Sequence, residues 1–333
     1  MQVPGADISN YANLVFPMPL KDGIQVDFRA SICKFTTCPG AWRPRASGIV
    51  QFGTGMSLDE YKGVFGECRA GGRGAAWLCG VLHFGHEGMY PLPEPLERAF
   101  AEADEIFFET DMDVISGYGF SRRLHELGTY GGQGCLREEL SCEVWECVVE
   151  VARGLGYSEA TVDNCRPWYC ASMLTSSALQ KAGFSSRLGI DGQLFMRASS
   201  EGRRIMAFET PDEQLELLSS LGADDPDGLV SGAMAEIREM ERFSGGLYRL
   251  WRVGDWDGLE ALIRTGMRGG EEEQTRILLE RNRKWTERLL AELAGGANVL
   301  AVIGAAHVIG ENGICRMLSD RLAGHVAGCV ETT

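Results

Sequence analysis

The stretches that decide the fold are Leu78-Cys79-Gly80-Val81-Leu82-His83 and Val302-Ile303-Gly304-Ala305-Ala306-His307. Each one closes a short apolar run with the motif Gly-x-x-His. Short apolar runs bounded by glycine are typical of buried strands, so we expect strands over Ala75–Leu82 and Asn298–Ala306. In parallel sheets, ligands bind beyond the carboxyl ends of the strands. The two stretches therefore predict a sheet with two histidines at its ligand-binding edge.

The segments that follow the two runs repeat the same order of elements. After the first run come a helical pattern over Pro93–Ala103 and a strand over Glu105–Glu109. After the second come a helical pattern over Gly313–Leu322 and a strand candidate over His325–Glu331. A strand-helix-strand unit of this size implies a right-handed crossover between parallel strands. We predict an α/β fold with pseudo-repeated strand-helix-strand units and a mostly parallel central sheet.

The middle of the chain, roughly residues 120–290, is expected to be a large helical section. Helical apolar spacing covers Glu138–Arg153, Pro167–Ala182 and Glu271–Leu293. A short strand over Arg203–Glu209 interrupts the helices. It is followed by a capping box in which Thr210 is the N-cap and Glu213 its partner.

Residues 1–74 have a different character. They carry Pro, Gly and short β-leaning runs at Ile24–Arg29, Ser31–Thr36 and Gly48–Phe52. We therefore expect a β-rich N-terminal extension over 1–74, followed by one α/β domain over 75–333.

The composition is that of an acidic globular protein. Of 333 residues, 44% are hydrophobic and 24% charged, which is ordinary for a folded domain. Nucleic acids and anionic membrane surfaces would repel the net charge of −15, so we expect neither as a partner. We also expect a cytoplasmic protein, because no apolar run is long enough to span a bilayer and the N-terminus lacks a secretory pattern. The 11 cysteines include no Cys-x-x-Cys pair, which favours reduced thiols.

His83, His307 and Glu109 are the first candidates for a reactive centre. Glu109 ends the strand expected to run parallel to the first apolar run, so its carboxylate belongs at the same sheet edge as the two imidazoles. Two histidines and a carboxylate are a common catalytic ligand set, which leaves a position for an activated water. Each histidine taken alone has a structural role as its alternative. We predict that the three residues hold one divalent metal ion, with Mn, Co and Zn not distinguished.

Further candidates are Glu209, Arg281 and Asn282. Glu209 ends a third strand just before a helix, so it either activates water or is a surface acid stabilised by the helix dipole. Asn282 falls on an apolar helical stripe, where a polar group needs a partner, and we expect it to orient another group. Arg281 either binds a substrate carboxylate or oxyanion or belongs to a basic helix face.

The other histidines have weaker support. His86 follows His83 by three residues, but the flanking glycines favour a loop at the rim of the site over a helix. Whether His86 is a ligand is left open. His125 and His325 are expected to be structural.

An ordered set of motifs resembles the TraB/PrgY/GumN family. The set opens with Leu78–His83, Tyr90-Pro91-Leu92-Pro93 and Ala103–Glu109. It continues with Pro167-Trp168, Gly189-Ile190-Asp191, Phe208–Gln214 and Trp251–Asp255. It closes with Glu280–Arg283 and Val302–Gly310. The resemblance covers residues 75–330 and implies that the two Gly-x-x-His motifs face one cleft of an α/β fold.

The resemblance also implies an activity. The family belongs with Tiki proteases, erythromycin-esterase-like enzymes and haem-binding ChaN-like proteins, and Tiki members are divalent-metal proteases. We therefore expect a divalent-metal-dependent peptidase that acts on a peptide or protein. Its catalytic residues would be Glu109, Glu209, Arg281 and Asn282. The alternatives are a metal-free hydrolase with His83 as general base, and a haem- or metal-binding protein without turnover; a homodimer is left open.

Overall fold

The computed structural model describes residues 62–69, 74–266, 271–323 and 330–331. Within these residues, a six-stranded sheet has the order β4-β3-β5-β2-β1-β6. The strands are β1 Val64–Arg69, β2 Ala75–Val81, β3 Glu105–Thr110, β4 Ile205–Glu209, β5 Val299–Gly304 and β6 Val330–Glu331. The pairs β2–β5, β5–β3 and β3–β4 are parallel, whereas β1 is antiparallel to both β2 and β6. The predicted α/β class with a mostly parallel sheet is confirmed.

The two Gly-x-x-His strands are neighbours in the sheet. All residues of β2 and β5 are buried, as their uninterrupted apolar sequences require. Val81 of β2 is paired with Gly304 of β5, so both motifs reach the same edge of the sheet. Because β5 also pairs with β3, it separates the two strands of the first strand-helix-strand unit.

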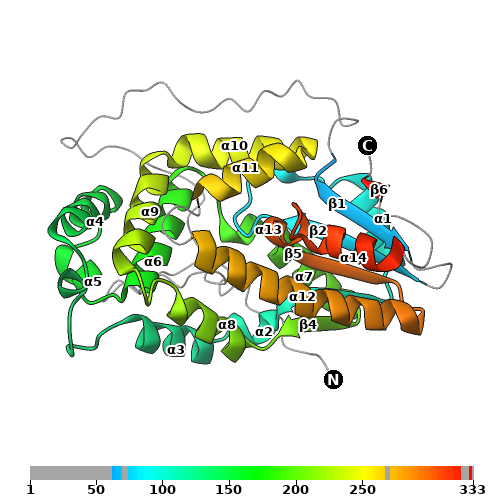
Figure 1. Cartoon of the computed structure of the whole chain (residues 1–333), viewed down its shortest axis with the longest axis horizontal. Coiled ribbons are helices and arrows are strands. Elements are labelled where there is room, and N and C mark those ends of the chain that lie inside the picture. The colour runs from blue at the N-terminus through cyan, green and yellow to red at the C-terminus, as the bar shows by residue number, and fades with distance from the viewer. Residues whose placement is uncertain (1–61, 70–73, 267–270, 324–329, 332–333) are drawn as a thin grey trace, which may run out of the picture.

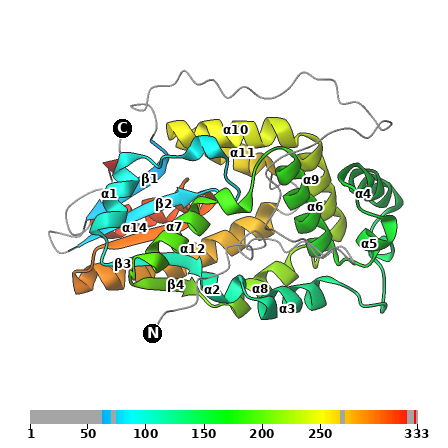
Figure 2. The ribbon, with the colours of Figure 1, turned by 180° about the vertical axis from the view of Figure 1, so that it is seen from behind.

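Helices cover both faces of the sheet. On the face seen in Figure 1 lie α12 (Glu271–Gly295) and α14 (Ile314–Ala323). On the opposite face, seen in Figure 2, lie α1 (Glu94–Glu102) and α7 (Ile190–Ser200). The main hydrophobic core fills the two layers between sheet and helices, which explains why the strands are apolar on both sides.

The predicted helical middle section forms a second lobe beside the sheet (Figures 1 and 2). Its helices are α3 Tyr118–Gly128, α4 Cys142–Leu155, α5 Glu159–Asp163, α6 Pro167–Lys181, α8 Pro211–Ser220 and α9 Pro226–Arg238. They enclose a separate core that includes Val148, Trp168 and Met234. Two further helices, α10 (Met240–Val253) and α11 (Trp256–Gly266), pack against each other and connect this lobe to α12.

Capping residues determine where several helices begin. Thr210 caps α8, and its reciprocal hydrogen bonds with Glu213 form the predicted capping box. The helix predicted from Glu138 begins only at Cys142, because the side chain of Ser141 accepts the N–H of Val144 and caps it. Residues 136–138 form a separate 3₁₀ turn.

The second strand-helix-strand unit departs from the prediction at both of its strands. The strand expected to reach Ala306 ends at Gly304, because residues 305–308 form the short helix α13 (Ala305–Val308). The last strand is described only at Val330–Glu331, where it pairs with β1 at the edge of the sheet.

The N-terminal extension is described only from residue 62. Its last part contains β1, which pairs with β2 along its whole length, so residues 64–69 belong to the same sheet as the predicted α/β domain. The other β-leaning runs of the extension lie outside the described residues. Cys68, near the end of β1, is disulfide-bonded, so the expectation of reduced thiols is wrong for this cysteine. Six other cysteines of the described residues are free thiols: Cys79, Cys135, Cys142, Cys147, Cys165 and Cys170.

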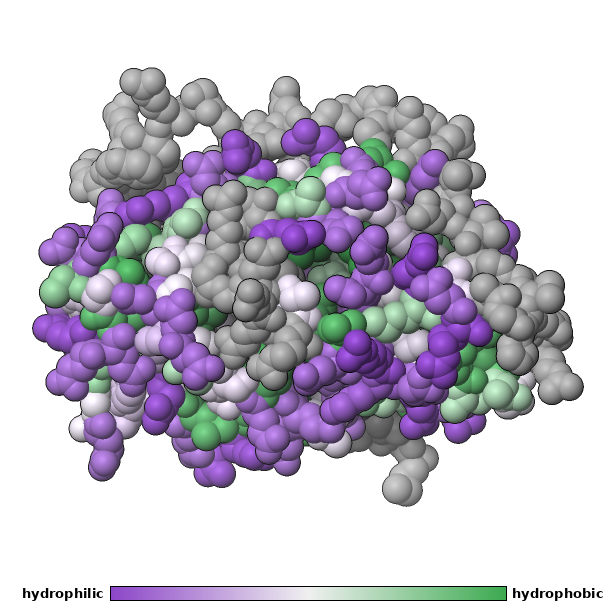
Figure 3. All heavy atoms as spheres, viewed as in Figure 1, coloured by the Kyte–Doolittle hydropathy of each residue, from purple (hydrophilic) through white to green (hydrophobic). Residues whose placement is uncertain are grey.

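On the face shown in Figure 3, polar residues cover most of the described surface, and apolar residues lie in separate small groups. None of the described helices combines the length and the apolar character that a passage through a bilayer requires.

Candidate functional site

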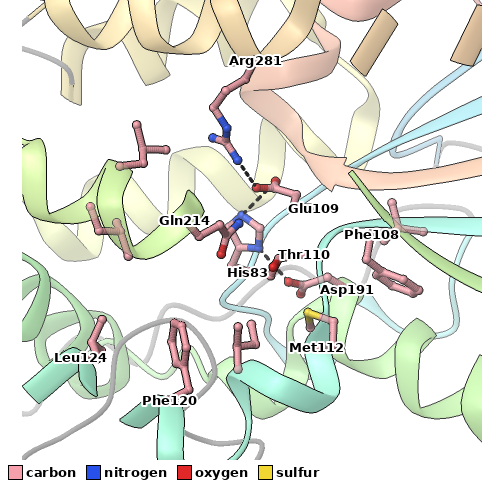
Figure 4. Close-up of a pocket in the computed structure, with 14 residues that line it drawn as sticks. His83, Phe108, Glu109, Thr110, Met112, Phe120, Leu124, Asp191, Gln214 and Arg281 are labelled. Atoms are coloured by element: carbon pink, nitrogen blue, oxygen red, sulfur yellow. Dashed lines mark hydrogen bonds and ion pairs between the residues drawn. The ribbon is translucent and has the colours of Figure 1, made fainter. Parts of the chain in front are cut away.

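The carboxyl edge of the sheet brings the predicted site residues together. His83 follows β2, Glu109 lies in β3, Glu209 ends β4, and His307 lies in α13 directly after β5. The long helix α12 crosses this edge and contributes Arg281 and Asn282. Figure 4 shows His83, Glu109 and Arg281 converging on one point.

His83 is held by a carboxylate that the sequence analysis did not assign. Its Nδ1 lies 2.8 Å from Oδ2 of Asp191 in the first turn of α7, and its Nε2 lies 3.7 Å from Oε1 of Glu109. Burial disfavours the charged imidazole, but Asp191 and Glu109 outweigh burial and raise the pKa of His83 to about 9. The side chain is 36% exposed, so Nε2 is open to a ligand while Nδ1 is fixed.

Glu109 lies between His83 and Arg281. Oε1 accepts the backbone N–H of Gly304 at 2.7 Å, and Oε2 accepts Nη2 of Arg281 at 3.0 Å. Burial would raise the pKa of this carboxyl, but the neighbouring His307, His83 and Arg281 and the N–H of Gly304 lower it to about 2. Glu109 is therefore ionised throughout the neutral range.

Gly304 shows why the second motif needs glycine. A Cβ at this position would lie 3.2 Å from both Nε2 of His83 and Oε1 of Glu109. Since few real Cβ atoms have such close neighbours, any side chain here would press into the centre.

The guanidinium of Arg281 ties three elements to α12. Nε and Nη2 donate to the two oxygens of Glu209 at 2.8 and 3.1 Å, Nη2 also donates to Glu109, and Nη1 donates to Nε2 of His307 at 3.1 Å. The guanidinium also stacks over the ring of Trp285, 4.6 Å from its centroid. The four hydrogen bonds use four of the five N–H groups of an arginine. Among the described residues, one N–H on Nη1 is therefore left for a ligand.

His307 is held as a neutral acceptor. Asn282 donates from Nδ2 to the carbonyl of Asn312 at 2.7 Å, which turns its Oδ1 toward Nδ1 of His307 at 2.5 Å. Nδ1 therefore carries the proton, and Nε2 accepts from Arg281. Burial first, and then the charges of Arg281 and His83, lower the pKa of His307 to about 3, against the opposing effect of Glu109.

Glu209 does not face the same space as His83. Besides its two contacts with Arg281, its Oε1 accepts Nε1 of Trp285 at 3.1 Å. It lines a separate cavity on the far side of Arg281. The structure thus places Glu209 where it positions the guanidinium, and places Asn282, which is fully buried, where it positions His307.

The three predicted metal ligands are close together but are not all free. Nε2 of His83 and Oε1 of Glu109 are spaced so that one ion, with bonds of about 2.1 Å, can bridge them. Nε2 of His307, however, accepts a hydrogen bond from a cation, Arg281. Among the described residues no group of three or more His, Cys, Asp or Glu side chains is arranged to hold a metal ion. The three-ligand set does not fit as arranged, and the metal site stays a prediction.

Two cavities meet at this centre, and His83, Glu109 and Arg281 line both. The smaller, about 220 Å³, is lined mainly by apolar side chains of α2 (Met112–Ile115), α3 and α8. The larger, about 470 Å³, is lined by α6, α9, α10, α11 and α13. A substrate bound in both cavities would pass His83 at its middle.

Two polar groups of the smaller cavity were also missed by the sequence analysis. Thr110 directly follows Glu109, and its buried Oγ1 has no hydrogen-bond partner in the described part of the chain. Gln214 lies on the first turns of α8 and faces the same cavity (Figure 4). The only signal for Thr110 was its position beside a strand-end acid, whereas Gln214 is the last residue of the family motif Phe208–Gln214.

The remaining histidines lie outside the centre. Nδ1 of His86 accepts the N–H of Gly88 at 3.0 Å, and its ring packs near Phe184 and Tyr248. His86 lines neither of the two cavities. His125 is exposed on α3 with its ring near Tyr169. His325 lies outside the described residues.

The fold and site define an α/β protein with a histidine–carboxylate–guanidinium centre at the carboxyl edge of a mostly parallel sheet. The model of the TraB/PrgY/gumN family matches residues 68–321, more than half of the chain. The chain belongs to this family. It is 24% identical to the uncharacterized protein YbaP of Escherichia coli (strain K12) over 241 residues, which cover 72% of this chain and 86% of YbaP. YbaP of Shigella flexneri matches to the same extent, and no solved structure matches significantly.

Proposed function

We propose that this chain is a hydrolase that cleaves a peptide bond of a peptide or protein with a water molecule activated by His83. One observation carries the proposal. His83 has Nδ1 fixed by Asp191 and Nε2 directed to a point that two cavities share. A histidine oriented by a carboxylate on one nitrogen and open on the other is the arrangement of a general base.

The charges around His83 support proton transfer from water. When Nε2 takes a proton, the imidazolium lies between the carboxylates of Asp191 and Glu109, which both stabilise it. The hydroxide formed adds to the carbonyl carbon of the scissile bond. The imidazolium then donates its proton to the leaving amine, so His83 returns to its neutral form.

Arg281 supplies the positive charge where negative charge develops. Its unengaged N–H on Nη1 can donate to the oxyanion, while Glu209, Glu109 and His307 hold the guanidinium in place. A preorganised donor of this kind costs no reorganisation during the reaction. The cavity lining is otherwise largely apolar, which strengthens the interaction.

A library of internally quenched peptides tests the proposal. The wild type is compared with His83→Asn and with His125→Asn, a matched substitution of an exposed histidine outside the centre. We expect His83→Asn to lower kcat/KM by about 10²-fold or more and His125→Asn to leave it unchanged. Wild-type activity in His83→Asn would contradict the proposal.

Metal dependence is tested with the same substrates. We expect activity to persist after dialysis against a strong chelator, because the derived steps use only protein side chains. If chelation abolishes cleavage and Mn, Co or Zn restores it, the general-base mechanism is wrong and the predicted metallopeptidase is supported. An absence of cleavage of any peptide by the wild type would reject peptidase activity altogether.

A further inference from the structure

The larger cavity contains one acid that the proposed mechanism does not use. Glu236 lies near the end of α9 and lines this cavity together with His83, Glu109, Arg281 and His307. The rest of the lining is apolar apart from Ser244, whose hydroxyl donates to the carbonyl of Met240.

The carboxylate of Glu236 makes no hydrogen bond or ion pair in the part of the chain that the structure describes. Among the described lining residues the cations are Arg281, which is bound to Glu109 and Glu209, and the protonated form of His83, which lies between Asp191 and Glu109. His307, the other nitrogen base on that side, is held as a neutral acceptor by Asn282 and Arg281. Neither cation forms an ion pair with Glu236 among the described residues, because each is already bound to other carboxylates.

A carboxylate in an apolar cavity without a neighbouring cation has an unfavourable free energy in its charged form. Burial raises the pKa of Glu236 to about 7, because the charged form loses hydration. A cation placed beside the carboxylate would stabilise the charged form and form a charge-assisted hydrogen bond. The apolar walls, which include Phe184, Phe243 and Leu247, would meanwhile accommodate the methylene stem of a long basic side chain.

We propose that Glu236 is a specificity-determining residue that binds a basic side chain of the substrate, while the smaller cavity takes an apolar side chain. This inference rests on the proposed function, since it assigns the two sides of the bond that His83 would hydrolyse. The volume of about 470 Å³ is in the range of small-ligand sites. A single carboxylate in a substrate pocket is also how trypsin selects basic residues.

The test uses pairs of quenched peptides that differ only by arginine or citrulline, which has nearly the same shape but no charge. We expect the wild type to cleave the arginine peptide at least about tenfold better, the effect of one charge-assisted contact. In Glu236→Gln the ratio should fall to about one. The control Glu239→Gln removes an acid three residues away that lines a different cavity, and it should keep the wild-type ratio.

Cleavage of both peptides at equal rates by the wild type would overturn the inference while leaving the hydrolase proposal intact. If neither peptide is cleaved, a binding measurement tests the inference independently of catalysis. N-acetyl-phenylalanyl-arginine amide and its citrulline analogue are titrated into His83→Asn and into His83→Asn/Glu236→Gln by calorimetry. We expect tighter binding of the arginine compound, at least about tenfold, only when Glu236 is present. Equal affinities would overturn the inference.

Discussion

The replacement Asp191→Asn is expected to move the pH profile of the reaction toward lower pH. Burial lowers the pKa of His83, but Asp191, 2.8 Å from Nδ1, and Glu109 together raise it to about 9. A general base must be neutral, so only about 1% of the wild-type molecules are competent at pH 7. The wild-type kcat/KM should therefore rise about tenfold per pH unit up to pH 8 and level off near pH 9.

In Asp191→Asn the amide can still accept the Nδ1 proton but has no charge. The pKa of His83 then falls toward the ordinary value of about 6.5, and the plateau of kcat/KM begins roughly one to two pH units lower. The plateau itself is expected to be lower, because an amide can also hold the wrong tautomer. The position of the inflection is therefore the diagnostic quantity, not the maximal rate.

The assay measures kcat/KM between pH 5.5 and 10 on a peptide that the wild type cleaves. A parallel NMR titration of the His83 ring protons reads the same pKa without turnover. Asp257→Asn, which removes an exposed acid on α11, is the control and should reproduce the wild-type profile. An inflection at the same pH in wild type and Asp191→Asn would refute the assignment of His83 as a base tuned by Asp191.

Two more predictions follow from Arg281 and His307. Arg281→Lys keeps the charge but cannot contact Glu109, Glu209 and His307 together, so kcat should fall about 10²–10³-fold with a smaller change in KM; a kcat close to that of wild type would remove Arg281 from the transition state. His307 stays neutral in the folded protein down to about pH 3, whereas in the unfolded chain it is protonated below about pH 6.5. His307 therefore contributes a loss of folding stability as pH falls, by about 1.4 kcal/mol per pH unit between pH 6.5 and 4.5. Glu236, whose pKa is raised to about 7, contributes the opposite slope in this window, so the two variants must be compared. In urea unfolding the slopes of wild type and His307→Asn should differ by this amount, and equal slopes would contradict the neutral, buried His307.

Much of the sheet edge was predictable because the signals are local. An apolar run bounded by glycine indicates a buried strand wherever it lies in the fold, and Ala75–Leu82 and Glu105–Glu109 were placed to within a residue. The capping box at Thr210 is equally local, since its hydrogen bonds join residues three apart. Because both residues lie at the ends of strands that were expected to be parallel, His83 and Glu109 could be predicted at one edge of the sheet without knowledge of the tertiary structure.

The partners across the site were not predictable in this way. Asp191 lies 108 residues from His83 in sequence, and no periodicity relates a helix start to a distant strand end. The position of β5 between β2 and β3 likewise depends on how the two strand-helix-strand units pack. The family motif containing Asp191 was visible in the sequence, but its chemical role required the distance to Nδ1.

Arg281 is the residue at which the two hydrolytic mechanisms differ. The centre contains the carboxylates of Glu109, Asp191 and Glu209 and one guanidinium, so with neutral His83 it has three negative charges and one positive charge. That excess of two negative charges would stabilise a bound divalent ion, so the charge of the centre does not distinguish the two mechanisms, whereas its geometry does. An ion bound by His83, Glu109 and His307 requires Nε2 of His307, which Arg281 now occupies. Arg281 would then have to leave His307 while Glu209 and Trp285 still hold its other side. With the guanidinium in place, its remaining N–H stays available to a substrate oxygen, and the proposed mechanism then relies on His83 to activate water.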